Sequence, residues 1–335
     1  MGTEHNQQTL EDVAGLVAAT IPGDWKQHDE HLVGLLKGGH GSYVAVVDTS
    51  SDPLVRVEVA LPESVPSGLE ATLAEACVQA NRDWLGSRLS CTQRYGGALV
   101  TEASLFVGPH AHEIDPAIVR ALLVRCITTA ASIPPLVSAI ERGTSPYDAP
   151  SFASDNRLLQ PGAGYPVAPA ADADLMDACL AAAHRAGWPA RRADPAYGNG
   201  ANSSHFIVTH DEESHPPIAT VEPRGGCLYA TSVVLGPEER QRVPRERRSA
   251  VAQLLNGLAN RTSLCGFALD LEEGFVRTDL VLDTLGCATP PSADTLCDFI
   301  LQAATSGASF REIIVSVAHR GADPDATLAE FAEAQ

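Results

Sequence analysis

The fold is decided by a stretch that occurs twice along the chain: LAEACVQANR at residues 73–82 and AQLLNGLANR at residues 252–261. Each stretch ends a segment with helical spacing of apolar residues, and two strand-like runs follow it around a glycine, Gly97 or Gly274. The two Asn-Arg pairs lie 179 residues apart, and the two glycines lie 177 apart. Solenoid repeats have periods of about 20–50 residues. A period this long therefore predicts a duplicated domain.

The similarity between the two copies extends on both sides of these two stretches. Later helical segments end at Arg142-Gly143 and Arg320-Gly321, and Trp25 is matched by Trp188. The run 43–48 is matched by 206–211 at an offset of 163. The offset changes between the third strand and the second helix of each copy, which predicts an insertion near 223–248 in the second copy, because loops tolerate insertions better than core elements.

These patterns predict an α+β protein made of two tandem copies of an α-β-β-β-α-β-β-α domain. We expect antiparallel sheets, because the strands cluster without crossover helices between them. The expected parts are a first domain at 1–143, a Pro/Gly/Ala-rich linker at 144–172 and a second domain at 173–335. Pro134 and Pro135 are expected to interrupt the closing helix of the first copy after 115–131, with a short helix continuing to Arg142. Gly307 marks an expected break between closing helices at 292–305 and 309–319, and a tail helix is expected from Pro324. The strands expected before the second helix of the first copy cover 24–29, 41–48 and 54–61. In the last of them, Arg56 and Glu58 alternate with valines, which predicts a half-buried strand with the charged residues on the solvated face. In the second copy the expected strands cover 188–192, 205–211 and 217–222, and a further strand at 227–234 within the insertion is left open.

Composition narrows the class of protein. The 335 residues carry a net charge of -19, which disfavours binding to nucleic acid and to anionic lipid surfaces. No apolar run approaches the ~20 residues needed to span a bilayer, and the first residues lack a secretion signal, so we expect a cytoplasmic protein. None of the eight cysteines forms a C-x-x-C pair, so we expect free buried thiols and neither a disulfide framework nor a zinc site.

Two histidine clusters are the strongest candidates for catalysis or metal binding. His205, His210 and His215 lie near the acidic run 211–213. On a strand, His205 and His210 would point to opposite faces because their separation is odd, so a solvated hairpin tip is the preferred interpretation. A metal-dependent hydrolase built on this cluster remains the alternative. The second cluster, His110 and His112, falls between a strand and a helix, where a loop is the preferred interpretation.

Two basic features invite a functional interpretation. The Asn-Arg pairs at 81–82 and 260–261 would form either a paired ligand site or helix C-caps; caps are preferred, because Asn tolerates the left-handed conformation that ends helices. The only concentration of basic residues is the candidate partner contact, although acidic residues are interleaved with it. It consists of Arg240, Arg242, Arg245, Arg247 and Arg248.

The chain carries no phosphate-binding, dinucleotide-binding, nucleophile-elbow or zinc-protease motif. We therefore expect no catalytic residues, no cofactor and no metal. A regulator that binds a small ligand between the two copies is the remaining alternative.

The order of elements resembles the type III secretion chaperone-like fold, especially its YbjN-like branch and the two-domain TY-Chap proteins of bacteria. The resemblance rests on Asn81, Arg82, Gly97 and the helical unit 115–143, with Asn260, Arg261, Gly274 and 292–321 as the second set. It implies a non-catalytic chaperone or adaptor that binds a client or effector protein in a secretion, effector or conflict system. It also implies a homodimer, or a monomer whose two copies form a pseudo-dimer.

Overall fold

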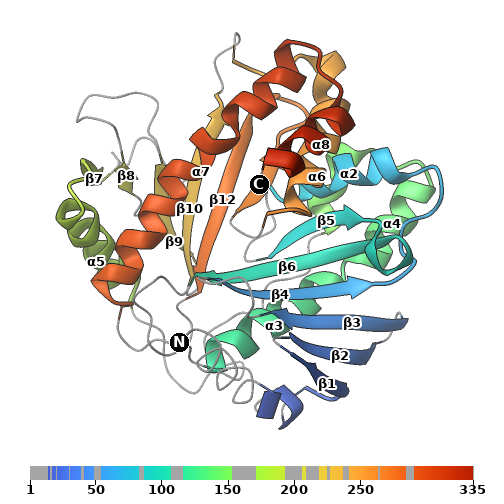
Figure 1. The fold of residues 1–335 in the computed structure, drawn as a ribbon, viewed down its shortest axis with the longest axis horizontal. Helices are drawn as coiled ribbons and strands as arrows, with labels where there is room; N and C mark the ends of the chain where they lie inside the picture. The colour runs from blue at the N-terminus through green and yellow to red at the C-terminus, as the bar shows by residue number, and fades with distance from the viewer. Residues whose placement is uncertain are drawn as a thin grey trace.

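A computed structural model describes residues 14–15, 17–19, 21–29, 31–38, 41–48, 54–82, 87–106, 116–152, 171–192, 206–208, 219–224, 227–236, 241–262, 265–283 and 290–334. Within these residues the chain forms two six-stranded sheets with helices packed on them (Figure 1). Every strand pairing among them is antiparallel. The α+β class with antiparallel sheets is therefore confirmed.

The first sheet has the strand order β1-β2-β3-β4-β6-β5. Helix α3 packs on β4 and β6, and α2 packs beside the edge strand β5. The strands are β1 (Asp24–His28), β2 (His31–Gly38), β3 (Gly41–Asp48), β4 (Leu54–Leu61), β5 (Arg88–Thr92) and β6 (Ala98–Phe106). The helical segments are α2 (Glu70–Ala80), η1 (Arg94–Gly96), α3 (Pro116–Ala130), α4 (Ile133–Glu141) and η2 (Pro146–Phe152).

The second sheet has the strand order β11-β12-β10-β9-β8-β7, which repeats the first order when each sheet is numbered from its own first strand. Its strands are β7 (Ala190–Arg192), β8 (Phe206–Val208), β9 (Ala219–Arg224), β10 (Cys227–Leu235), β11 (Gly266–Leu269) and β12 (Val276–Asp283). Its helical segments are α5 (Asp172–Arg185), η5 (Arg245–Arg247), α6 (Arg248–Ala259), α7 (Ala293–His319) and α8 (Pro324–Ala334).

The predicted order of three strands before the second helix is wrong, because in each six-stranded sheet four strands precede that helix. Strand β2 was missed in the first sheet: its glycines look like loop residues in the sequence. Gly34 instead lies directly opposite Trp25 on β1, and a Cβ at Gly34 would stand 2.4 Å from the indole ring. Glycine is needed there because the ring lies flat over the neighbouring strand.

The strand considered at 227–234 within the expected insertion near 223–248 forms as β10, at residues 227–235. This strand lies between β9 and β12, just as β4 lies between β3 and β6. The sequence match of 43–48 with 206–211 therefore pairs strands in different positions, because β3 is third from its sheet edge and β8 is second. Short apolar strands have similar sequences, so matching of short segments aligned β3 with β8 although β9 occupies the equivalent position.

The expected helix break at Gly307 is absent, and α7 runs without interruption from Ala293 to His319. Gly307 is buried against β10, where a Cβ would stand 2.3 Å from Ser232 Oγ. Glycine weakens a helix by about 1 kcal/mol relative to alanine but does not end it. Here it allows the helix to approach the sheet closely.

Other local predictions are confirmed. The β5–β6 and β11–β12 hairpins form around Gly97 and Gly274, both with positive φ. The first closing helix breaks before Pro134 and Pro135, which lie in the first turn of α4, where proline is tolerated. The tail helix forms as α8. Within the predicted linker, η2 packs against α2 and buries Ala149 completely.

One stretch of the described residues, Leu122–Glu141, has the length and composition of a membrane span, with mean hydropathy 1.5. The expectation that no apolar stretch reaches this length therefore needs correction. The stretch combines the end of α3 with α4, and 61% of its most apolar window is buried inside the protein. This burial is that of core helices.

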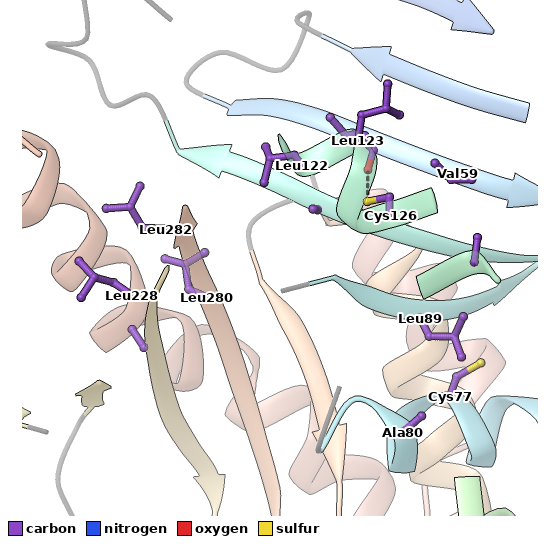
Figure 2. Packing of buried hydrophobic residues seen from close by; sticks show 14 of the residues in the cluster. Val59, Cys77, Ala80, Leu89, Leu122, Leu123, Cys126, Leu228, Leu280 and Leu282 are labelled. Atoms are coloured by element: carbon purple, nitrogen blue, oxygen red, sulfur yellow. Dashed lines mark hydrogen bonds between the residues drawn. The ribbon is translucent and has the colours of Figure 1, made fainter. Parts of the chain in front are cut away.

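The main hydrophobic core continues from the first sheet to the second. Leu122 and Leu123 on α3 belong to the same buried cluster as Leu228, Leu280 and Leu282 on the second sheet (Figure 2). Cys126 lies in this cluster, and its thiol donates to Val57 O at 3.7 Å. Seven cysteines lie in the described residues; all are free and six are buried, which confirms the expected thiols there.

Candidate functional site

The most elaborate polar arrangement lies where the two sheets meet. Helix α2 packs on α6 (Figure 1), and each of the two helices also contacts the edge strand of the other sheet: α2 contacts β11, and α6 contacts β5. Val78 on α2 belongs to the same buried cluster as Val251 and Leu255 on α6. We call this region the junction.

Asn81 ties the first edge strand to the second sheet. Its Oδ1 accepts from Leu89 N at 2.7 Å, and its Nδ2 donates to Leu89 O at 3.0 Å and to Phe267 O at 3.2 Å. The amide side chain therefore satisfies both backbone groups of an edge residue, as a neighbouring strand would. The Asn81 side chain is buried with all three bonds made.

Two asparagines of α6 act on β5 from the other side. Asn256 Oδ1 accepts from Cys91 N at 2.7 Å, and Asn256 Nδ2 donates to Cys91 O at 2.7 Å. Asn260 Nδ2 donates to the same carbonyl at 2.8 Å. The outward backbone groups of Leu89 and Cys91 are thus occupied by asparagine amides, which block further strand pairing at these two positions.

Further bonds cross the junction around Asp270. Its carboxylate accepts from Arg82 at 2.9 Å and from the backbone N–H groups of Glu272 and Glu273. Gln79 Oε1 accepts from Leu271 N at 2.8 Å. Buried polar groups are costly unless paired, so the Arg82–Asp270 and Leu271–Gln79 bonds, which cross the junction, favour one relative position of the sheets.

The C-cap interpretation of the Asn-Arg pairs was correct in position and wrong in mechanism. Asn81 and Asn260 do follow the last residues of α2 and α6, but their φ angles are -60° and -77°, in the right-handed region. Their side chains bond across the junction. The arginines differ: Arg82 pairs with Asp270, whereas Arg261 is exposed.

A charged cluster lies on the open face of the first sheet, opposite α3. Glu58 on β4 and Glu102 on β6 are directly opposite each other and only 5% and 2% exposed. Two carboxylates in this position repel each other unless cations lie between them. Arg56 supplies that charge, at 2.8 Å from Glu58 and 3.1 Å from Glu102. The sequence suggested a solvated strand face here, which is wrong at Glu58.

Other groups complete this cluster. Arg94 Nη2 lies 2.5 Å from Glu58 Oε1, and Tyr95 donates to Glu58 at 3.2 Å. Arg88 donates both to Glu102 and to the backbone carbonyl of Cys265, which links the cluster to the second sheet.

The surroundings of this cluster favour the charged guanidinium of Arg56 and the neutral phenol of Tyr95. Burial lowers the pKa of Arg56, but the Glu102 and Glu58 carboxylates outweigh burial and the net shift is upward. Burial and Glu58 raise the pKa of Tyr95 to about 12.

The second sheet lacks this double carboxylate. The strand position of Glu102 is taken by Asp279, which lies opposite Gly266 as Glu102 lies opposite Arg88. Thr231 is paired with Asp279 and donates to it at 3.0 Å. The two open faces therefore differ in charge although their strand orders agree.

Four buried thiols are poorly suited to nucleophilic catalysis. Burial raises the pKa of Cys91 to about 11 and the pKa of Cys126, Cys179 and Cys265 to about 12. A thiol with such a pKa carries little thiolate at neutral pH.

The candidate partner-contact arginines are placed differently from one another. Arg247 donates three hydrogen bonds to Val317 O and Ala322 O at the end of α7, and Arg248 donates to the carbonyls of residues 243, 271 and 272. Arg242 pairs with Glu273 at 2.8 Å. Arg245 is exposed, and Arg240 lies outside the described residues.

The histidine clusters at 205–215 and 110–112 also lie outside the described residues. Within the part of the chain that the structure describes, no group of three or more His, Cys, Asp or Glu side chains could hold a metal ion.

Sequence reasoning missed Asn256, Gln79 and the Glu58–Glu102 pair. An alternating strand pattern with Arg56 and Glu58 looks solvated, because the pattern does not show that Arg94 and Tyr95 fold over it. The available signal was the presence of charged residues in three mainly uncharged strands: Arg56 and Glu58 in β4, Arg88 in β5 and Glu102 in β6.

Comparison of the chain with protein-family models, with curated proteins and with solved structures finds no match.

Proposed function

We propose that the chain is a tandem duplication that works as a non-catalytic chaperone or adaptor and binds a partner protein. The observation that carries this proposal is the junction. Two sheets with the same strand order are joined through the same short segment of each half, the Asn-Arg segment that ends α2 and α6. A self-paired arrangement of this kind is what fusion of a homodimer would produce.

The hydrogen bonds and ion pairs of the site also support the proposal. The buried carboxylates are neutralised by arginines, and the interface asparagines are bound to backbone groups. These groups hold two halves in one position, as a rigid binding scaffold requires. The resemblance to bacterial secretion chaperones favours a client or effector protein as the partner, with the chain acting as a monomeric pseudo-dimer or a homodimer.

The test begins with chemical crosslinking of the tagged protein in an extract of its source organism, followed by mass spectrometry. A recovered partner is then purified, and titration calorimetry with purified components should show saturable binding. A variant with Asn81→Ala and Asn256→Ala serves to ask whether binding needs the junction. Failure of every crosslinked protein to bind when purified would refute the proposal.

A further inference from the structure

The open face of the first sheet carries an apolar strip beside the charged cluster. Because side chains alternate along a strand, Val33 and Leu35 on β2 and Val44 and Val46 on β3 share the face opposite α3. Leu35 lies opposite Val44, and Val33 lies opposite Val46. Leu35 is 47% exposed and the three valines are partly exposed. Figure 1 shows these strands at the margin of the molecule, away from the second sheet.

Cations border this strip on three sides. The chain has only two lysines, and both lie here: Lys26 on β1 opposite Val33, and Lys37 two residues beyond Leu35. On the far side Arg94 binds Glu58, which lies opposite Val46.

The exposed charges of this border are mainly positive. Lys26 and Arg94 have side chains 66% and 42% exposed, and Lys37 is also exposed. Asp24 is exposed too, but it lies 3.7 Å from Lys26 and offsets part of one charge. The Glu58 carboxylate is 6% exposed beneath Arg94, so little of its charge reaches the surface. In a chain of net charge -19, this strip presents three exposed cations.

We infer that this strip, here called the lysine strip, docks an amphipathic helix of a partner protein with acidic residues on both flanks of its apolar stripe. The inference rests on the proposed function, because it names the surface and the chemistry of the partner. Charge complementarity identifies the acidic flanks, and the four apolar side chains identify the stripe.

Geometry favours a helix over an extended segment. Face contact leaves the backbone of an extended segment without hydrogen-bond partners, whereas a helix satisfies its own. Strands lie about 4.8 Å apart, so Lys26 on β1 and the β4 flank stand about 14 Å apart, which accommodates a helix about 10 Å wide. Residues i and i+4 of a helix rise about 6 Å, close to the roughly 6.7 Å between Val33 and Leu35 along a strand.

The test uses fluorescence anisotropy with the full-length protein and labelled synthetic helices. The probe has leucines at helical i, i+3, i+4 and i+7 spacing with glutamates on both flanks. We expect saturable binding that weakens at least tenfold with Leu35→Ser and at least tenfold with Lys26→Glu plus Lys37→Glu. The charge-reversed variant should regain binding to a matched helix with lysine flanks. Leu301→Ser is the control, because Leu301 on α7 is 44% exposed and lies on the other sheet's helix layer.

Each other outcome overturns the inference. Equal binding of a proline-interrupted probe would indicate an extended segment at the β1 edge. Equal binding of the lysine-flanked helix to the unchanged protein would remove the charge argument. Loss of self-association on Leu35→Ser in sedimentation would assign the strip to a second copy of the chain. If a purified natural partner binds unchanged to both variants, the lysine strip is refuted while the proposed function stands. Circular dichroism confirms that each variant is folded.

Discussion

Replacing Asn81 with alanine separates an interface role from a helix-cap role. The change removes three hydrogen bonds and leaves Leu89 N, Leu89 O and Phe267 O without this partner. An unsatisfied buried backbone group costs about 1–3 kcal/mol, and a partly relaxed set of three gives a loss of about 3 kcal/mol. Asn260→Ala should cost less, about 1 kcal/mol, because Cys91 O keeps its bond from Asn256.

Urea unfolding followed by circular dichroism and tryptophan fluorescence measures both losses. Asn81→Asp is the matched variant, since it keeps the oxygen that accepts from Leu89 N but places a second oxygen against two carbonyls. We expect it to be at least as unstable as Asn81→Ala. Equal losses below about 1 kcal/mol for Asn81→Ala and Asn260→Ala would refute the reasoning, because two simple caps would behave alike.

Three further changes test other parts of the structure. Gly307→Ala should destabilise the protein by about 1–3 kcal/mol in thermal or urea unfolding despite the better helix propensity of alanine, because the added Cβ meets Ser232 Oγ. Adding Ser232→Ala should recover part of this loss. A stabilised Gly307→Ala variant would contradict the close approach of α7 to the sheet. Arg247→Ala should lower the free energy of unfolding by about 1.5–3 kcal/mol, because it removes charged hydrogen bonds to the backbone at the end of α7. Arg245→Ala, which changes an exposed side chain, should alter this free energy by no more than about 0.5 kcal/mol. Equal effects of the two substitutions would contradict the role assigned to Arg247. The free energy of unfolding should fall as the pH rises above about 9, because thiols of the unfolded chain ionise there while Cys126, Cys179 and Cys265 of the folded protein keep their protons until about pH 12. Each of these thiols contributes a slope of about 1.4 kcal/mol per pH unit. Urea unfolding in reductant between pH 8 and 10 measures this slope, and a flat profile would contradict the burial of the thiols.

Local features of the fold could be predicted because they depend on neighbours in sequence. Gly97 and Gly274 occupy positive-φ positions at the expected turns, and Pro134 and Pro135 lie at the expected interruption. The same local reasoning failed at Gly34 and Gly307. There the glycine accommodates Trp25 from another strand or Ser232 from another layer, and nothing in the adjacent sequence announces that contact.

Some residues of the candidate site could be predicted from the sequence, but their hydrogen-bond partners could not. Asn81 and Asn260 were recognised because they recur, but recurrence cannot show that each amide reaches a strand of the opposite half. Glu58 and Glu102 were unrecognised as a pair because 44 residues separate them in sequence and only strand pairing brings them together.

By itself, the sequence determined most of the helices, the two hairpins around Gly97 and Gly274, and which residues recur, because helical periodicity, turn glycines and composition act over a few neighbouring residues. Only the tertiary structure decided that each sheet has four strands before its second helix, that asparagines occupy the β5 edge, and that both lysines border one apolar strip. These features depend on contacts between residues distant along the chain, and a hydrogen bond or steric contact of that kind exists only once the sheets have assembled.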